Sequence, residues 1–324
     1  MRRSARRVRF VAGSGALALA AALSGCGTKQ VVLPVDTNGV VWTRITNSAS
    51  VINPLGPDWR GDSIVVQNFR YYDATHGSDR IATMRADGSE LTYVPGPPLA
   101  FTSDQRPKWV NDSILVFTTN RVTGAYDIFY RNLRTGVVRA LTNFPGNEFD
   151  PDPQPGRPGL VFTDGPGRFQ GRIAVIPDTA GVPLNVRYLT PDSLTSGEPD
   201  WDPTGTRLCF SADSADGSRH VWLATLTPGD TTLTQLTTGP FQDFTPRWMP
   251  DGLRIVFTSN RTGRSGLWWV SEAGEGAGLN VVAFEDAGAS MFTPAVSPDG
   301  TKIVVSSDGR GFGSSLWVLS NFHF

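Results

Sequence analysis

Three aspartates share one position relative to a proline, and their spacing could bind a metal ion. Asp104, Asp150 and Asp243 each stand three residues before a proline, in the pattern Asp-x-x-Pro. Convergent carboxylates would suit a hard cation such as Ca²⁺, which takes several oxygen ligands. Alternatively, each aspartate accepts backbone N–H groups in its own turn. Because the aspartate recurs with a repeat, the turn is the favoured interpretation, and Ca²⁺ is the only cofactor that we consider.

The sequence contains no other motif with which we can associate catalysis. Its three histidines, His76, His220 and His323, are far apart, and no His-x-x-x-His, Glu-x-x-His or Cys-x-x-Cys pair occurs. A Gly-x-Ser-x-Gly nucleophile elbow is also missing. We therefore expect a protein that is not an enzyme.

A further set of residues suits recognition. Arginine and aromatic side chains combine directed hydrogen-bond donors with rigid apolar area, and they are frequent where proteins bind partners. Several lie in the polar segments expected between a second and a third strand of the repeat; the binding candidates are Arg70, Tyr71, Tyr72, His76, Arg168, Phe169 and Phe312. The alternative is that the aromatic side chains only pack between neighbouring repeats.

These residues are placed on a repeat of about 47 residues, which is anchored by Pro-x-Trp. The anchoring prolines are Pro57, Pro107, Pro199 and Pro246, with degenerate copies near Pro153 and Pro294. Each copy predicts a short strand, an apolar strand and a third strand, and every copy but the third has a tight turn with Asp or Gly after the first strand. Four copies also predict a fourth strand that ends in Leu-Thr; these pairs are Leu91-Thr92, Leu141-Thr142, Leu189-Thr190 and Leu236-Thr237.

Four strands per copy at this period predict a β-propeller, because one sheet cannot bury both of its faces and must stack on its neighbours. We predict an all-β protein in which residues 39–324 form six four-stranded antiparallel blades. The copies Pro246 to Trp268 and Pro294 to Trp317 resemble the repeat of TolB-type propellers. The resemblance covers roughly residues 40–324, and the third copy departs most from it.

The sixth copy has no fourth strand of its own, since only five residues follow its third strand at 315–319. A strand-like segment from Val40 to Thr46 precedes the first anchor instead, and its Ile45-Thr46 resembles the end of a fourth strand. We predict that this N-terminal strand pairs with the last blade and closes the ring, which removes an open sheet edge.

The first 25 residues predict a cleaved signal peptide, with five arginines before a short apolar run. Leu23-Ser24-Gly25-Cys26 resembles the lipobox of bacterial lipoproteins, which implies that Cys26 is acylated and that residues 26–38 are a lipidated tether. The alternative is an ordinary secretory signal. The resemblance places the protein on the periplasmic face of a bacterial envelope, with Gly27 favouring the outer membrane, or outside a Gram-positive cell.

Loss of the five leader arginines would leave a net charge near −6, which argues against nucleic acid as a partner. We expect a monomer that contacts the membrane only through its lipid. Our first hypothesis is a non-catalytic envelope scaffold that presents one loop face to a protein or glycan. The alternative is an enzyme of lyase or lactonase type that uses a carboxylate-held metal in the propeller channel.

Overall fold

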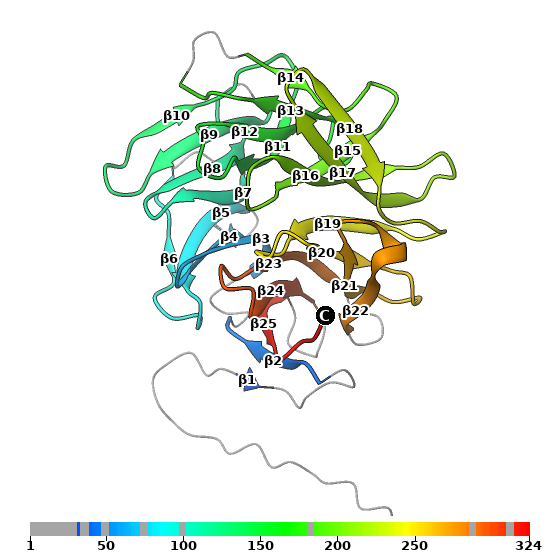
Figure 1. Cartoon of the computed structure of the whole chain (residues 1–324). Helices are drawn as coiled ribbons and strands as arrows, with labels where there is room; N and C mark the ends of the chain where they lie inside the picture. Colours follow the sequence, from blue (N-terminus) through cyan, green and yellow to red (C-terminus); the bar gives the residue numbers. More distant parts are fainter. Residues whose placement is uncertain are drawn as a thin grey trace, which may run out of the picture.

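The computed structural model describes residues 31–32, 39–46, 52–71, 77–96, 102–122, 124–180, 185–284, 290–308 and 314–324. These residues form six antiparallel sheets that follow one another along the chain (Figure 1). The first strands of consecutive sheets contact each other in a closed series, from β3 through β7, β11, β15, β19 and β23 back to β3. This arrangement confirms the predicted six-bladed propeller.

The blades have the following strands. Blade 1 contains β3 (Ile52–Arg60), β4 (Ser63–Tyr71), β5 (Gly77–Arg85) and β6 (Thr92–Tyr93). Blade 2 contains β7 (Asp104–Asn111), β8 (Ile114–Thr119), β9 (Asp127–Asn132) and β10 (Val138–Ala140). Blade 3 contains β11 (Glu148–Pro153), β12 (Leu160–Asp164), β13 (Arg172–Ile176) and β14 (Arg187–Tyr188).

The second half of the ring repeats the pattern. Blade 4 contains β15 (Ser196–Trp201), β16 (Arg207–Asp213), β17 (Arg219–Thr227) and β18 (Asp230–Gln235). Blade 5 contains β19 (Asp243–Trp248), β20 (Arg254–Ser259), β21 (Gly266–Ser271), the 3-10 turn η1 (Glu275–Ala277) and β22 (Leu279–Phe284). Blade 6 contains β23 (Met291–Val296), β24 (Lys302–Ser307), β25 (Ser315–Ser320), β2 (Val41–Arg44) and β1 (Val31–Val32).

The N-terminal strand closes the ring. β2 pairs antiparallel with β25, with Trp42 opposite Leu319, and the two strands lie side by side in Figure 1. The Ile45 N–H donates to the carbonyl of Leu316 at 3.0 Å, which extends the pairing beyond β2. This result confirms the predicted closure. β1 adds a fifth strand to the blade by pairing with the free side of β2.

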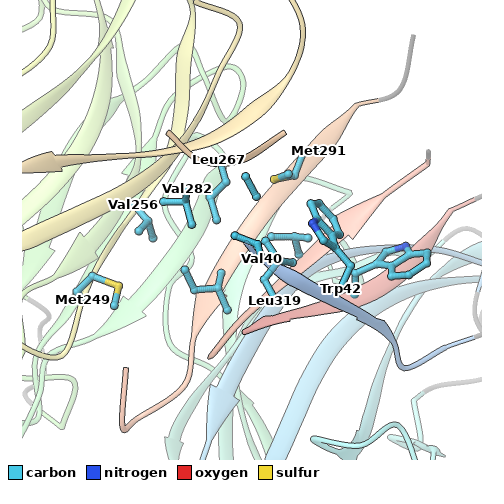
Figure 2. Packing of buried hydrophobic residues seen from close by; sticks show 12 residues of the cluster. Val40, Trp42, Met249, Val256, Leu267, Val282, Met291 and Leu319 are labelled. Carbon is cyan, nitrogen blue, oxygen red and sulfur yellow. The ribbon is translucent and has the colours of Figure 1, made fainter. Parts of the chain in front are cut away.

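The closing strand is also held by apolar packing. Trp42 is fully buried, and the edge of its ring meets Trp317 of β25 at a centroid distance of 6.2 Å. Val40 and Trp42 belong to one cluster with residues of the fifth blade, including Val256 and Leu267 (Figure 2). The N-terminal segment therefore fills the space between the fifth and sixth blades as well as completing a sheet.

The threonine at the end of the fourth strand has a structural role that explains its recurrence. Its hydroxyl accepts a hydrogen bond from a backbone N–H of the third strand at 2.8–2.9 Å; the pairs are Ile128 to Thr142, Ile173 to Thr190, Val221 to Thr237 and Leu316 to Thr46. Thr46 therefore does for the sixth blade what the other threonines do for theirs. In the second, third and fourth blades the leucine before this threonine donates its own N–H to a carbonyl of the third strand. In the first blade Val94, not Leu91, takes this place and donates to the carbonyl of Ile81.

Each inner strand has a bulge at the residue before its anchoring proline. That residue has a left-handed φ in all six blades: Gly56 (55°), Arg106 (49°), Asp150 (49°), Glu198 (59°), Thr245 (51°) and Thr293 (31°). A left-handed φ before proline is strained for any residue but glycine. The repetition of the same bulge identifies this position in the third blade without ambiguity.

The bulge corrects the phase of the third copy. Its anchoring proline is Pro151, because Pro153 pairs with Leu160 as Trp201 pairs with Leu208 in the next blade. Alternating prolines at 151, 153 and 155 obscured this phase in the sequence. Asp150 therefore directly precedes its proline, and Glu148 occupies the place that Asp104 and Asp243 occupy in their blades.

Aspartates in the anchor connect neighbouring blades. The carboxylate oxygen Oδ2 of Asp58, Asp152 or Asp200 accepts the backbone N–H at the tryptophan position of the next blade; these donors are Trp109, Trp201 and Trp248, at 2.8–2.9 Å. In the second blade Lys108 occupies the position of the aspartate. In the third blade Pro153 occupies the position of the tryptophan, and it has no N–H to donate. Both partners of that hydrogen bond are thus replaced together.

Candidate binding site at the channel mouth

A lysine and three aspartates lie within the central channel. Lys108 Nζ lies 3.3 Å from Asp58 Oδ1 and 3.2 Å from both Asp152 Oδ1 and Asp200 Oδ1. Burial disfavours the charged lysine, but the three carboxylates outweigh it and raise the pKa of Lys108. Burial, together with the neighbouring Asp200, raises the pKa of Asp152 to about 7, although Lys108 opposes this shift. The lysine ammonium, together with Arg247, whose Nε lies 3.7 Å from Asp200 Oδ1, therefore offsets part of the negative charge of a buried cluster of acids.

A second charged group lies beside the anchoring prolines of the inner strands. Arg106 Nε is 3.5 Å from Asp150 Oδ1, and Arg168 donates a hydrogen bond to the same oxygen. Burial and the nearby guanidinium of Arg168 lower the pKa of Arg106 to about 9. Burial alone would raise the pKa of Asp150, but Arg168 and Arg106 reverse this effect and lower it. A small gap of about 10 Å³ remains at this level of the channel.

A large open cavity lies next to these charges. Its volume is about 950 Å³, and residues of blades 1 to 6 line it, including Leu55, Arg106, Glu198 and Met291. This volume is at the upper end of the range of roughly 300–1,000 Å³ that is usual for ligand sites. The cavity is therefore large enough for a substantial ligand.

One wall of the cavity is aromatic. Phe169, from the β12–β13 loop, meets Phe244 of β19 edge to face, with ring centroids 5.6 Å apart. The guanidinium of Arg219 lies over both rings, at 5.5 and 6.0 Å, and donates to the Phe169 carbonyl at 3.2 Å. This bond and these ring contacts hold the loop of the third blade against the fourth and fifth blades.

The charged residues next to the cavity have unmet hydrogen bonds. Arg106 is 8% exposed, and its Nε and Nη1 have no hydrogen-bond partner among the described residues. Glu198 is 1% exposed; its Oε2 accepts from Ser211 Oγ (3.0 Å) and from the Thr245 N–H (2.8 Å), while its Oε1 has no described partner. A ligand that entered the cavity could form hydrogen bonds with these buried polar atoms.

The structure brings only some of the sequence-predicted binding residues together. Arg168 and Phe169 line the cavity. Arg70 ends up on the exposed side of β4, 4.8 Å above the ring of Tyr93, and the backbone of Tyr71 pairs with Gly77. The other predicted residues lie outside the described part of the chain; they are Cys26, Tyr72, His76 and Phe312.

The three aspartates considered as metal ligands do not gather. Asp104 accepts from Arg121 Nη2 at 2.7 Å, and Asp243 accepts from Arg261 Nη2 at 2.8 Å, each within its own blade. Asp150 alone faces the channel. Within the described ranges, no three His, Cys, Asp or Glu side chains form a cluster that could hold a metal ion.

Sequence reasoning missed Arg106, Glu198 and Arg219. The first two occupy the position before the anchoring proline, where the six blades carry Gly, Arg, Asp, Glu, Thr and Thr while the proline that follows repeats. A variable position inside a regular repeat is the signal that could have identified this part of the cavity. Arg219 had no such signal, because the two aromatic rings that it contacts belong to two other blades.

Glu148 differs from its equivalents in a way that predicts a pH effect. Asp104 and Asp243 have arginine partners, but the position equivalent to these arginines in the third blade is Pro166. Burial raises the pKa of Glu148 to about 8; Asp127 and Asp164 nearby add to this shift, and the Thr142 hydroxyl opposes it. Between pH 4.5 and 8 the folded state therefore binds one more proton at Glu148 than the unfolded state does. The free energy of unfolding consequently falls as the pH rises through that window.

We expect Glu148→Gln to stabilise the protein by about 1–3 kcal/mol at pH 9 and to have little effect at pH 4.5. Thermal or urea unfolding at the two pH values measures the difference. Glu90→Gln, at an exposed turn, is the matched control and should change stability by less than about 0.5 kcal/mol at either pH. An equal gain at pH 4.5 and pH 9 would show that charge on Glu148 is not the cause.

Known proteins share this fold. Residues 188–319 match the model of the TolB beta propeller domain. TolB from Acinetobacter baumannii is similar with a TM-score of 0.59 and 17% identity over 82% of this chain, which spans 66% of that protein. A gluconolactonase from Xanthomonas campestris is similar with a TM-score of 0.62 and 12% identity, over 92% of this chain and 96% of its own.

An oligogalacturonate lyase in complex with manganese is also similar, with a TM-score of 0.58 and 13% identity over 90% of this chain and 96% of the lyase. No curated protein matches the chain in sequence. These low identities show a shared fold and leave the activity open. The family match covers the last three blades, and the structure shows the same four-stranded repeat in all six, so the chain is a six-bladed β-propeller whose last three blades match the TolB beta propeller domain.

Proposed function

We propose that this protein is a non-catalytic binding protein of the bacterial envelope, and that the cavity at the channel mouth receives its protein or glycan partner. The observation that carries this proposal is the cavity of about 950 Å³ whose lining includes the buried, incompletely hydrogen-bonded Arg106 and Glu198. A partner that pairs with these groups gains hydrogen bonds to side chains that are already buried and oriented.

The cavity lining supports recognition because its charged side chains are already oriented. Arg168 is bonded to Asp150, and Arg219 is bonded to Asp213. Ser211 and Thr245 both hold Glu198. Side chains that are fixed before binding lose little conformational entropy when a partner arrives. The Phe169–Phe244 wall adds a rigid apolar surface of the kind that anchors binding interfaces.

The proposed location rests on the N-terminal sequence. The lipobox-like Leu23-Ser24-Gly25-Cys26 supports acylation of Cys26 and attachment to the envelope by lipid. None of the described segments is a helix with the length and apolarity needed to cross a membrane. β1 lies within the predicted tether and pairs with β2, so the tether leads to the sixth blade.

Photocrosslinking tests this function. A benzophenone amino acid at position 169 should capture one discrete partner in intact cells, because Phe169 lines the cavity and is 37% exposed. The same amino acid at position 324 is the control, since Phe324 is 36% exposed and does not line the cavity. Equal products from both positions, or none from position 169, would contradict the proposal.

Metal analysis of the purified protein separates binding from the alternative of a lyase or lactonase. We expect less than one tenth of an equivalent of any divalent metal, because Arg121, Arg261 and Lys108 already pair with the nearby carboxylates. A stoichiometric metal that disappears in Asp150→Asn would favour the enzyme instead.

A further inference from the structure

The charged side chains beside the cavity limit which chemical groups a ligand could place there. Arg106 offers an unpartnered donor at Nη1, while its Nε faces Asp150 Oδ1 at 3.5 Å, and Glu198 offers an unpartnered acceptor at Oε1. Both side chains line the same cavity, and each is at least nine-tenths buried. Glu198 cannot turn away freely, since its other oxygen accepts two hydrogen bonds.

An ionic ligand group fits this mixture poorly. A carboxylate that reached Arg106 would approach the negative Glu198 and Asp150, and Glu198 lies close enough to Arg106 to act on its pKa. An ammonium that reached Glu198 would meet Arg106 and Arg168, of which Arg168 also lowers the pKa of Arg106. Like charges at short range oppose each approach. A neutral hydroxyl can accept from a guanidinium and donate to a carboxylate at once.

The remaining lining suits a ring that carries several hydroxyls. The edge-to-face pair of Phe169 and Phe244 gives a rigid apolar surface for the C–H face of a sugar ring. Amide and hydroxyl side chains occupy other parts of the lining, including Asn53, Gln242 and Ser290. These groups exchange hydrogen bonds with hydroxyls without requiring a charge.

We propose that the cavity binds an uncharged saccharide, with sugar hydroxyls on Arg106 and Glu198 and a ring face on Phe169. This inference rests on the proposed function and specifies the partner of that same site as a glycan. The cavity volume of about 950 Å³ gives room for an oligosaccharide segment, which is the form of saccharide that we assign to it. A peptide is the other class of occupant, and binding of peptides alone would overturn the proposal.

An array that carries neutral oligosaccharides beside uronate- and sialate-containing ones tests the ligand class. The purified protein should bind neutral members, and calorimetry with the best of these should show affinity losses of about tenfold or more for Phe169→Ala and for Glu198→Gln. Glu198→Gln keeps an oxygen that can accept from Ser211 and Thr245, so the fold should persist. Phe324→Ala is the matched control and should bind as the parent does.

Selective binding of acidic sugars that becomes tighter in Glu198→Gln would overturn the assignment of a neutral ligand. An array without any bound member would overturn the saccharide proposal itself. If photocrosslinking at position 169 still captured a protein, the proposed binding function would stand with a different class of partner. If both experiments failed, the binding function would fail with it.

Discussion

Replacing Lys108 by methionine should lower the free energy of unfolding by about 3–5 kcal/mol at pH 8, because it leaves buried charge without its partner. Asp152 and Asp200 each lie 3.2 Å from the lysine Nζ, and Asp58 lies 3.3 Å from it. Without the ammonium these carboxylates repel each other at the inner strands of three blades. Denaturant unfolding measures the loss, and Lys302→Met, on the exposed part of β24, is the matched control.

The loss in Lys108→Met should depend on pH in a defined direction. Asp152 already has a pKa raised to about 7 with the lysine present, and removal of the lysine raises it further. The folded variant then takes up protons as the pH falls, so its deficit should shrink from pH 8 to pH 5. Adding Asp152→Asn should recover part of the stability at pH 8. A deficit that stays constant between pH 5 and pH 8 would exclude repulsion among the three acids as its cause.

Deletion of Val40 to Thr46 should lower the melting temperature by about 10 °C or more and broaden the transition. The deletion removes the whole of β2, the buried Trp42 and the hydrogen bond from Leu316 to Thr46. Loss of one large buried aromatic side chain alone costs about 3–5 kcal/mol, and each kcal/mol shifts the melting temperature by about 2–4 °C in proteins somewhat smaller than this one. The exposed edge of β25 should also promote aggregation.

Single substitutions separate packing from strand pairing in the closing segment. Trp42→Ala should lose most of the stability that the deletion loses, since its ring packs on Trp317 in a core between two blades. Thr43→Ala, at the next position of the same strand, keeps the backbone pairing with Val318 and should cost less than about 1 kcal/mol. A deletion variant that melts like the parent would show that the ring does not depend on its N-terminal strand.

The blade count and the closure could be predicted because they depend on features that recur. Each copy repeats its turn residues and its apolar strand, so a missing fourth strand at one end and a spare strand at the other are visible in the sequence. Thr46 illustrates the reason, since its hydroxyl makes the same hydrogen bond as Thr142, Thr190 and Thr237. The third copy was harder, because three alternating prolines allow two phases that only the bulge at Asp150 distinguishes.

The cavity could not be predicted to the same extent. Its lining comes from residues that meet across blades, such as Phe169 of the third blade and Phe244 of the fifth. The repeat fixes the position of each residue within its blade, but these contacts depend on how a loop leans over its neighbours. Arg121 and Arg261 show the converse case, because each pairs with an aspartate of its own blade at the same two positions of the repeat.

The most direct test of the proposed binding function is the equilibrium affinity of the partner captured at position 169 for four proteins, namely the parent chain, Phe169→Ala, Glu198→Gln and Phe324→Ala. We expect the two cavity variants to bind about tenfold more weakly or worse, while Phe324→Ala and the parent bind equally. Equal affinities for all four proteins would contradict the assignment of the channel-mouth cavity as the binding site.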